Sequence, residues 1–198
     1  MPSDALVLGF DTSAAHCAAA LLRGDTVLAS RLEEMTRGQA ERLMPLLDEV
    51  LAEGGAAWAD LDAIGVGIGP GNFTGIRIAV SAARGLALGL DIPAVGVNGF
   101  DARHHPGTLA AVPAPRDHVY ALPPGGEPRL MPLVEAQAVA AAHDLELLAE
   151  ATPPNIAEAI ARNAVDRYQT EAVAPAPLYL RAADAAPARD APPTLIDG

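Results

Sequence analysis

Gly67-Ile-Gly-Pro-Gly-Asn-Phe-Thr-Gly-Ile-Arg77 is the stretch of this 198-residue sequence that decides its fold. It joins a glycine-rich apolar strand predicted over 63–68 to a helix predicted over 76–90. Glycines let a chain turn sharply, and the free N–H groups that begin a helix attract anions. The stretch lacks the lysine of a Walker loop, and Asn72 stands where a dinucleotide loop needs its third glycine. Two interpretations therefore stay open: an anion-binding loop, or a tight turn with close helix packing.

Upstream of this stretch the apolar pattern predicts three strands and a helix. The strands are expected over 5–10, 16–22 and 26–32, as an antiparallel meander. The helix is expected over 39–53, where Pro45 should kink it or mark its first main turn. Its apolar face has the i, i+3, i+4, i+7, i+8 spacing and consists of Leu43, Leu46, Leu47, Val50 and Leu51.

Downstream, a strand is expected over 94–97, and the remaining chain is less regular and rich in proline, which suits turns and edge strands. Tyr120 and Leu122 are expected on one strand, and helices over 135–143 and 155–168. The pattern indicates an α/β protein. Three parts are predicted: an N-terminal lobe at 1–103, a smaller C-terminal lobe at 104–181 ordered at its end around 178–180, and a flexible Ala/Pro-rich tail at 182–198.

Charge and residue usage exclude several classes of protein. The net charge of −12 argues against direct binding of nucleic acid, because neutralising phosphates needs clustered cations. All thirteen basic residues are arginine, so there is no lysine for a phosphate loop or a Schiff base. Cys17, the single cysteine, is expected as a small apolar filler in a strand. The apolar run 5–10 is too short for a signal-peptide core, and we expect a cytoplasmic protein.

The candidate polar residues follow the first strand. Asp11, Thr12 and Ser13 could present a carboxylate and two hydroxyls to a phosphate or a hydrated metal, although such residues also end strands with side-chain turns. The five histidines form no His-Glu-x-x-His and no other helical i, i+4 pair, so no metal site is expected, and His104 and His105 are predicted in a surface loop. No Gly-x-Ser-x-Gly nucleophile motif occurs.

Three blocks of residues carry a family likeness: Gly9-Phe-Asp-Thr-Ser13, Glu41-Arg-Leu-Met-Pro-Leu-Leu-Asp-Glu49, and the decisive stretch together with Gly85-Leu-Ala-Leu88. Over about the first hundred residues the chain resembles the bacterial TsaB (YeaZ) family, accessory subunits of tRNA threonylcarbamoyladenosine synthesis. The resemblance implies an actin-like ATPase fold (ASKHA, ribonuclease H-like) of two lobes with a shortened second lobe. It also implies a non-catalytic subunit that is required for threonylcarbamoylation of adenosine 37 in tRNA.

The resemblance implies partners as well. The chain would form a heterodimer with the catalytic subunit TsaD, work with the ATPase TsaE, meet tRNA only through the complex, and without TsaD could pair with itself. The two predicted helices would be the contact, although their apolar faces could equally be plain core. The expected interface residues are Leu43, Met44, Leu47, Leu51, Ile76, Ala79, Val80 and Ala83. Charged substitutions at Leu47 or Val80 are expected to break the heterodimer.

The same resemblance implies turns like phosphate loops that no longer serve catalysis. They would be formed by Asp11, Thr12, Ser13, Gly69, Gly71, Asn72, Thr74 and Gly75. No cofactor would be required by this chain, and ATP or ADP would bind only in the complex.

TsaD provides a test of whether this chain could itself be catalytic. TsaD-like chains carry the metal ligands Val-Asn-His-x-x-x-His after the corresponding strand. Here Val97-Asn98 is followed by Gly99, and Arg103 takes the second ligand position, so no metal site is expected. A small-molecule kinase or ATPase of the same fold, with Asp11 holding magnesium, stays an alternative. A metalloprotease is a weaker one.

Overall fold

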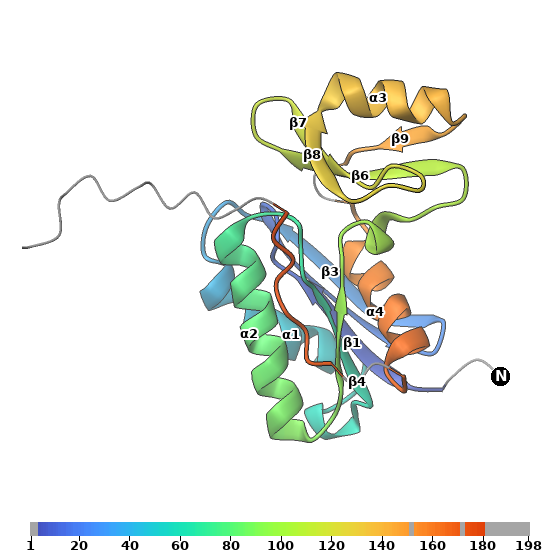
Figure 1. Cartoon of the computed structure of the whole chain (residues 1–198). Coiled ribbons are helices and arrows are strands. Elements are labelled where there is room, and N and C mark those ends of the chain that lie inside the picture. Colours follow the sequence, from blue (N-terminus) through green and yellow to red (C-terminus); the bar gives the residue numbers. More distant parts are fainter. Residues whose placement is uncertain (1–3, 151–152, 171–172, 181–198) are drawn as a thin grey trace, which may run out of the picture.

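Two sheets organise the computed structural model, which describes residues 4–150, 153–170 and 173–180 (Figure 1). A five-stranded sheet has the order β3-β2-β1-β4-β5, and a four-stranded sheet has the order β8-β7-β6-β9. The first sheet consists of β1 Leu6–Asp11, β2 His16–Arg23, β3 Thr26–Glu34, β4 Ala63–Gly67 and β5 Ala94–Val97. The second consists of β6 Thr108–Ala114, β7 His118–Ala121, β8 Arg129–Pro132 and β9 Glu146–Leu148. The helices are α1 Gln39–Glu53, α2 Phe73–Leu90, α3 Leu133–Ala142 and α4 Ile156–Arg167.

The first sheet follows the predicted order of elements. Strands β1 to β3 pair as an antiparallel meander, β4 pairs in parallel with β1, and β5 pairs in parallel with β4. Strand β1 is central and fully buried, which explains its unbroken apolar run. Helix α1 has the bounds read from the sequence, with Pro45 inside it. Helix α2 begins earlier than predicted because the Asn72 side chain caps it by accepting a hydrogen bond from Gly75 N.

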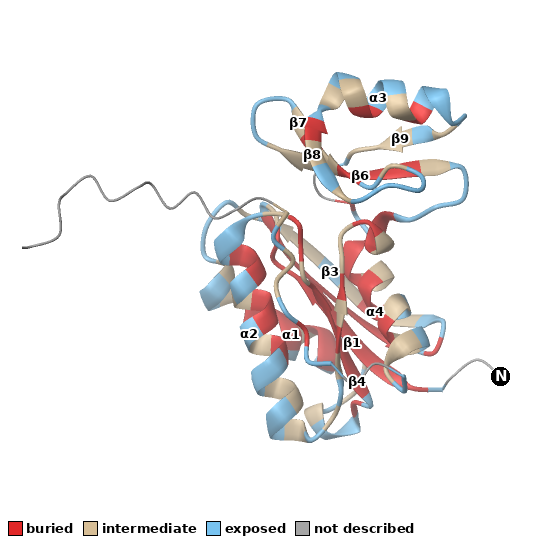
Figure 2. Ribbon diagram, in the orientation of Figure 1, coloured by how far each residue is buried: buried red, intermediate tan, exposed pale blue. Residues whose placement is uncertain are grey.

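Helices cover both faces of the first sheet (Figures 1 and 2). Helices α1 and α2 pack on one face, over a core that includes Phe10, Leu46 and Ile64. Helix α4 packs on the other face and lies close to β1, because Gly9 has no Cβ. A Cβ there would lie 2.6 Å from the carbonyl oxygen of Ala157.

The position of α4 corrects the predicted lobe boundary. The pattern predicts all of 104–181 in the second lobe, whereas α4 lies against β1, β2 and β4 of the first sheet. The apolar side chains of Ile156 and Ile160 are buried there. The segment 173–180 also returns to the first lobe, where Leu178 N donates a hydrogen bond to Ile68 O. The predicted tail at 182–198 lies outside the described residues.

The second lobe is a small sheet covered by α3 (Figure 1). Strands β6 and β8 were missed in the sequence because proline suggested irregular chain, and β9 was missed because it has only three residues. Pro113 fits in β6 because β9 pairs only with Thr108–Ala110, so the far end of β6 is paired on one side alone. Tyr120 lies on β7 as predicted, while Leu122 follows its end.

Candidate functional site

A buried cluster of polar side chains lies where β1 ends. Asp11 is the last residue of β1, and His16 is the first of β2, so the turn between them brings both side chains together. The N–H at His16 Nε2 donates to Asp11 Oδ2 at 2.7 Å, and Ser13 Oγ donates to the same oxygen at 2.8 Å. His16 is completely buried and Asp11 is 2% exposed. The cluster is therefore part of the interior.

A buried arginine completes the electrostatics of this cluster. Burial by itself raises the pKa of Asp11, but the hydrogen bonds from His16 and Ser13 and the charge of Arg103 outweigh it, so the pKa is lowered. Burial lowers the pKa of Arg103, and Asp11 and Glu150 oppose that shift. Arg103 also donates to Gly99 O at 3.1 Å.

Three atoms of the cluster have no hydrogen-bond partner among the described residues: Asp11 Oδ1, His16 Nδ1 and Arg103 Nε. Asp11 Oδ1 lies against Gly67, where any Cβ would overlap it. The described part of the chain contains no group of three or more His, Cys, Asp or Glu side chains that could hold a metal ion.

The glycine loop packs against the turn that follows β1. Thr12 Oγ1 donates to Gly75 O at 2.7 Å, and Asn72 N donates to Ser13 O at 2.7 Å. A Cβ at Gly71 or Gly75 would overlap the backbone oxygen of Ser13 or Thr12. These glycines are therefore explained by a tight strand-to-helix turn. Anion binding by the loop stays a prediction.

A hollow of about 340 Å³ separates the two lobes above this turn. Ser13, Gly71 and Asn72 line it, whereas Asp11, Thr12, Gly69 and Gly75 are buried behind it and Thr74 is exposed at the start of α2. The remaining lining residues are Ala14, Ala15, Thr36, Gln39, Val112, Pro113, Ala114, Pro115 and Tyr120. None of the lining side chains is a carboxylate, imidazole or thiol, so the hollow offers hydrogen bonds and little acid–base chemistry.

Seven of the eight predicted interface residues are buried inside this chain. Leu43, Leu47, Leu51, Ile76, Ala79, Val80 and Ala83 are at most 3% exposed, and Met44 at 39% is the exception. The apolar periodicity marked the faces that pack on the sheet.

The opposite faces of the two helices are exposed and form what we call the outer face. It consists of Glu41, Met44, Pro45, Asp48 and Ala52 on α1 and Arg77, Ser81, Arg84, Gly85 and Leu88 on α2.

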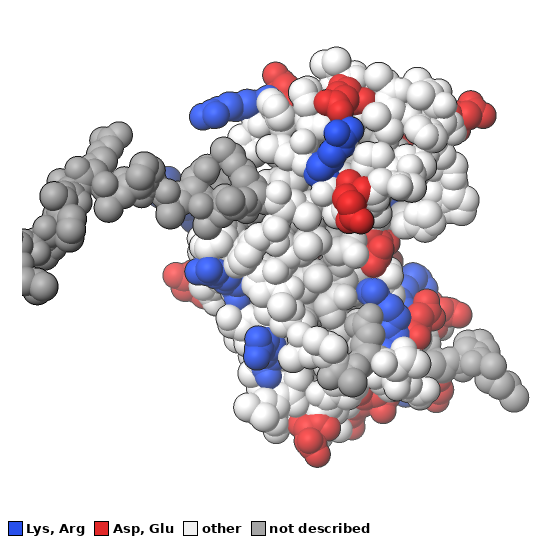
Figure 3. Space-filling view, viewed as in Figure 1, with Lys and Arg blue, Asp and Glu red and all other residues white. Residues whose placement is uncertain are grey.

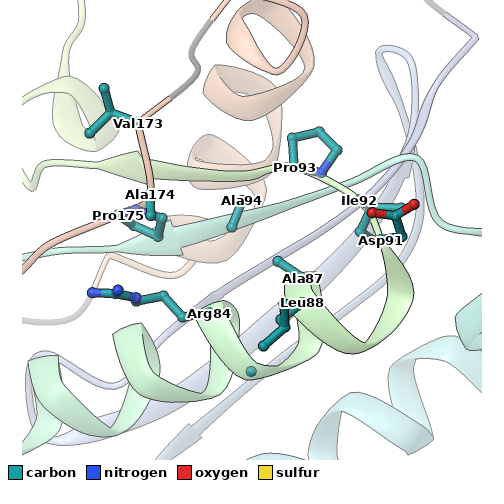
Figure 4. A pocket seen from close by; sticks show the side chains of 11 residues that line it. Arg84, Ala87, Leu88, Asp91, Ile92, Pro93, Ala94, Val173, Ala174 and Pro175 are labelled. Atoms are coloured by element: carbon teal, nitrogen blue, oxygen red, sulfur yellow. The ribbon is translucent and has the colours of Figure 1, made fainter.

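Helix α2 is unusually apolar for its exposure. Its mean hydropathy is 1.3, and only 28% of its residues are buried. By length and composition it is the one described helix that could cross a membrane, which a core helix also satisfies. A hollow of about 720 Å³ follows its second half, with Arg84 and Leu88 on one side and Val173 to Pro175 on the other (Figure 4). Leu88 is 86% exposed. Such a surface suits a protein contact.

Three residues that contribute to these sites, His16, Arg103 and Tyr179, were not predicted as site residues. His16 follows the Asp11 turn at the start of a strand, and Arg103 was considered only as a missing ligand. Tyr179 lies over α2, where its hydroxyl accepts a hydrogen bond from Arg77 Nε at 2.9 Å and its ring lies 5.0 Å from that of Phe73. The contact between Arg77 and Tyr179 joins positions 102 residues apart, so no local pattern could reveal it. His16 and Asp11 are only five residues apart, and their spacing was the signal that could have revealed this pair. His104 and His105 are exposed, as predicted.

Comparison with known proteins identifies relatives of the chain. Residues 27–136 match the family model described as TsaD: tRNA N6-adenosine threonylcarbamoyltransferase. The tRNA threonylcarbamoyladenosine biosynthesis protein TsaB of Haemophilus influenzae is 34% identical over 123 residues, which are 58% of this chain and 51% of that protein. The tRNA N6-adenosine threonylcarbamoyltransferase of Jannaschia sp. is 37% identical over 116 residues, 49% of this chain and 32% of that protein. The chain thus spans about half the length of the TsaB relatives, or less.

A solved structure supports the same assignment over more of the chain. A Pseudomonas aeruginosa protein, described as uncharacterized with similarity to peptidase YEAZ, matches 89% of this chain and 100% of its own at a TM-score of 0.71 and 26% identity. The predicted actin-like ATPase fold is confirmed. Since the family model covers more than half of the sequence, the chain belongs to the TsaD family and, within it, resembles the bacterial TsaB (YeaZ) proteins.

Proposed function

We propose that this chain is a non-catalytic subunit of the machinery that makes threonylcarbamoyladenosine at position 37 of tRNA. It binds TsaD through the outer face of α1 and α2, acts together with TsaE in the cytoplasm, and meets tRNA only through the complex. The TsaB-named relatives support the pathway. The net charge of −12 fits a subunit that leaves tRNA contacts to its partner.

The observation that carries this proposal is the exposure of α2. A helix with a mean hydropathy of 1.3 and 28% of its residues buried leaves apolar surface in water, which a partner would cover. The polar groups buried behind the hollow between the lobes support the same proposal. Thr12, Ser13 and Asp11 are engaged with groups of this chain, so they are poorly placed to serve a substrate.

Deletion of the gene tests the role in tRNA modification. Digested tRNA is analysed by nucleoside mass spectrometry, and we expect the modified nucleoside to disappear and to return when the gene is restored. The purified chain, mixed with tRNA, threonine, bicarbonate and ATP, should modify nothing alone. Intact modification in the deletion strain would refute the proposal.

Binding is tested with the TsaD of the same genome on a sizing column. A shared peak is expected with the wild type, and addition of ATP or ADP should produce nucleotide binding only when the complex is present. ATP turnover by the purified chain alone would instead support the kinase or ATPase alternative, in which Asp11 holds magnesium.

A further inference from the structure

The hollow of about 720 Å³ beside the second half of α2 holds the most exposed apolar side chains of the described chain. Leu88 lines it from α2 and Val173 lines it from the segment that returns to the first lobe. They are 86% and 81% exposed, more than any other large apolar residue that the structure describes. A hollow of this size is within the range of ligand sites, so it can accept the side chains of a short segment.

The hollow has a basic end and an acidic end. Arg84 and Asp91 both line it and lie at its opposite ends, about 10 Å apart along α2 (Figure 4). Arg84 makes no side-chain hydrogen bond or ion pair with the described residues. In the space-filling view, basic side chains and no acidic ones lie over the middle of α2 (Figure 3). A carboxylate is therefore favoured at the Arg84 end and repelled at the other.

The chain carries a matching sequence beyond the described residues, in the tail at 182–198. Leu195 and Ile196 are the only large apolar residues of this tail, and Asp197 follows them directly. Pro192 and Pro193 come shortly before, and proline restricts φ, which lowers the entropy lost when an extended segment docks. An apolar pair followed by a carboxylate has the same order as the apolar middle of the hollow and its basic end.

The tail is also of the right length to reach the hollow. Tyr179 lies where the tail starts, and its hydroxyl accepts a hydrogen bond from Arg77 Nε at 2.9 Å. From Arg77 to Leu88 the distance along α2 is about 16.5 Å. A flexible chain of the length that joins Leu180 to Leu195 spans about 20 Å on average. A tethered segment has its highest effective concentration when its length matches the span, as it does here.

We propose that the tail docks in this hollow of its own chain. Leu195 and Ile196 contact Leu88 there, and Asp197 pairs with Arg84. In the opposite direction, Asp197 would face Asp91, and the two carboxylates would repel each other. The docking itself does not depend on the proposed function. If that function holds, the tail covers part of α2, and TsaD has to displace it.

Disulfide cross-linking of the full chain tests this arrangement. One cysteine replaces Gly85, where the space at the Cβ is open, and the other replaces Gly198, next to Asp197. The native Cys17 is buried and its pKa is raised to about 12, so it does not take part. Under mild oxidation, Gly85→Cys/Gly198→Cys should form an intramolecular disulfide at least about tenfold faster than the matched control Ala138→Cys/Gly198→Cys, with Ala138 on the exposed side of α3.

Two sets of further variants test the apolar and the charged contact separately. In the cross-linking chain, Leu195→Ser/Ile196→Ser should lower the rate to that of the control, because the apolar surface that the hollow buries is gone. Arg84→Glu should slow the reaction about threefold, as expected for an exposed ion pair. Adding Asp197→Arg to that variant should restore the rate, because opposite charges then meet again.

Methyl NMR of the chain without introduced cysteines provides a second measurement. The methyl signals of Leu88 and Val173 should shift between the wild type and Leu195→Ser/Ile196→Ser. Val134 is the control in the same spectra, since it is 70% exposed on α3. Its signals should stay in place.

Several results would overturn this inference. They are a cross-linking rate no faster than that of the control, Leu88 signals that do not shift, and Val134 signals that shift instead. A disulfide that forms only between two chains, at a rate that rises with protein concentration, also overturns it, because the tail then docks on another molecule.

Binding to TsaD separates this inference from the proposed function. The oxidised, cross-linked chain should bind TsaD more weakly than the same chain after reduction. A wild type that does not bind TsaD overturns the proposed function alone.

Discussion

Replacing Asp11 with Asn tests whether the polar cluster is structural. The change keeps the shape of the side chain and removes the charge that accepts hydrogen bonds from His16 and Ser13. Each of these bonds should lose about 1 kcal/mol on becoming neutral. Arg103 also loses the carboxylate that stabilises its charge most, at a cost of about 1–2 kcal/mol. The sum, about 3–4 kcal/mol, corresponds to a fall of roughly 10 °C in Tm for a chain of this size.

The assay is urea unfolding followed by circular dichroism, with Asp117→Asn as the control. Asp117 is exposed, and its variant should remain within about 0.5 kcal/mol of the wild type. The double variant with His16→Gln should be less destabilised than the two single changes added together, because both remove the same contact. A loss below about 1 kcal/mol for Asp11→Asn would refute the reasoning. If the wild-type chain hydrolysed ATP and the Asp11→Asn variant did not, the carboxylate would belong to a magnesium site.

Other predictions follow from single contacts. Gly9→Ala should lower the free energy of unfolding by about 2–3 kcal/mol in urea, because the added Cβ would meet the backbone of α4. Gly85→Ala is the control and should not destabilise the chain, because the space at its Cβ is open. Leu47→Asp should unfold the chain, because it buries an unpaired charge, whereas Met44→Asp should keep the native circular dichroism and weaken binding to TsaD. Burial raises the pKa of Cys17 to about 12, so a thiol reagent at pH 8 should label it only in urea.

Acid should remove the contribution of Asp11 to stability. Its pKa is lowered in the folded chain, so the contribution is complete above the unfolded value of about 3.9 and is lost as pH falls through the folded value. The urea midpoint of the wild type should therefore fall below about pH 4 more steeply than that of Asp11→Asn. Parallel curves for the two proteins would contradict this.

The first lobe could be predicted because its signals are local. The apolar spacing from Leu43 to Leu51 gave the true bounds of α1, and the run before Asp11 gave β1. The second lobe could not be predicted in the same way. Proline does not exclude a strand that is paired on one side only, as β6 is at Pro113. The place of α4 depends on Gly9, which is far away in the sequence, so its lobe could not be read from its own pattern.

The interface residues show a second limit of periodicity. An amphipathic helix has one apolar stripe, and the pattern that makes Leu47 and Val80 conspicuous is the pattern of residues that a sheet buries. Residues that are free to meet a partner lie on the opposite, exposed stripe, where apolar character is weaker and charges are mixed in. Met44 was included only because it widens the stripe, while Arg77 and Arg84 were not among the predicted interface residues.

Burial and charge together support the proposal that this chain acts through its surface. At the end of β1, Ser13 and His16 bind the Asp11 carboxylate, and the Thr12 hydroxyl binds the backbone of Gly75. Arg103 supplies a positive charge near Asp11, so these polar groups are already engaged within the described part of the chain. On α1 and α2 the situation is reversed, since apolar side chains are exposed and two arginines and two carboxylates keep unused capacity. A catalytic subunit needs free groups in its cleft, whereas a subunit that acts by association needs them on its surface. The distribution in this chain is the second kind.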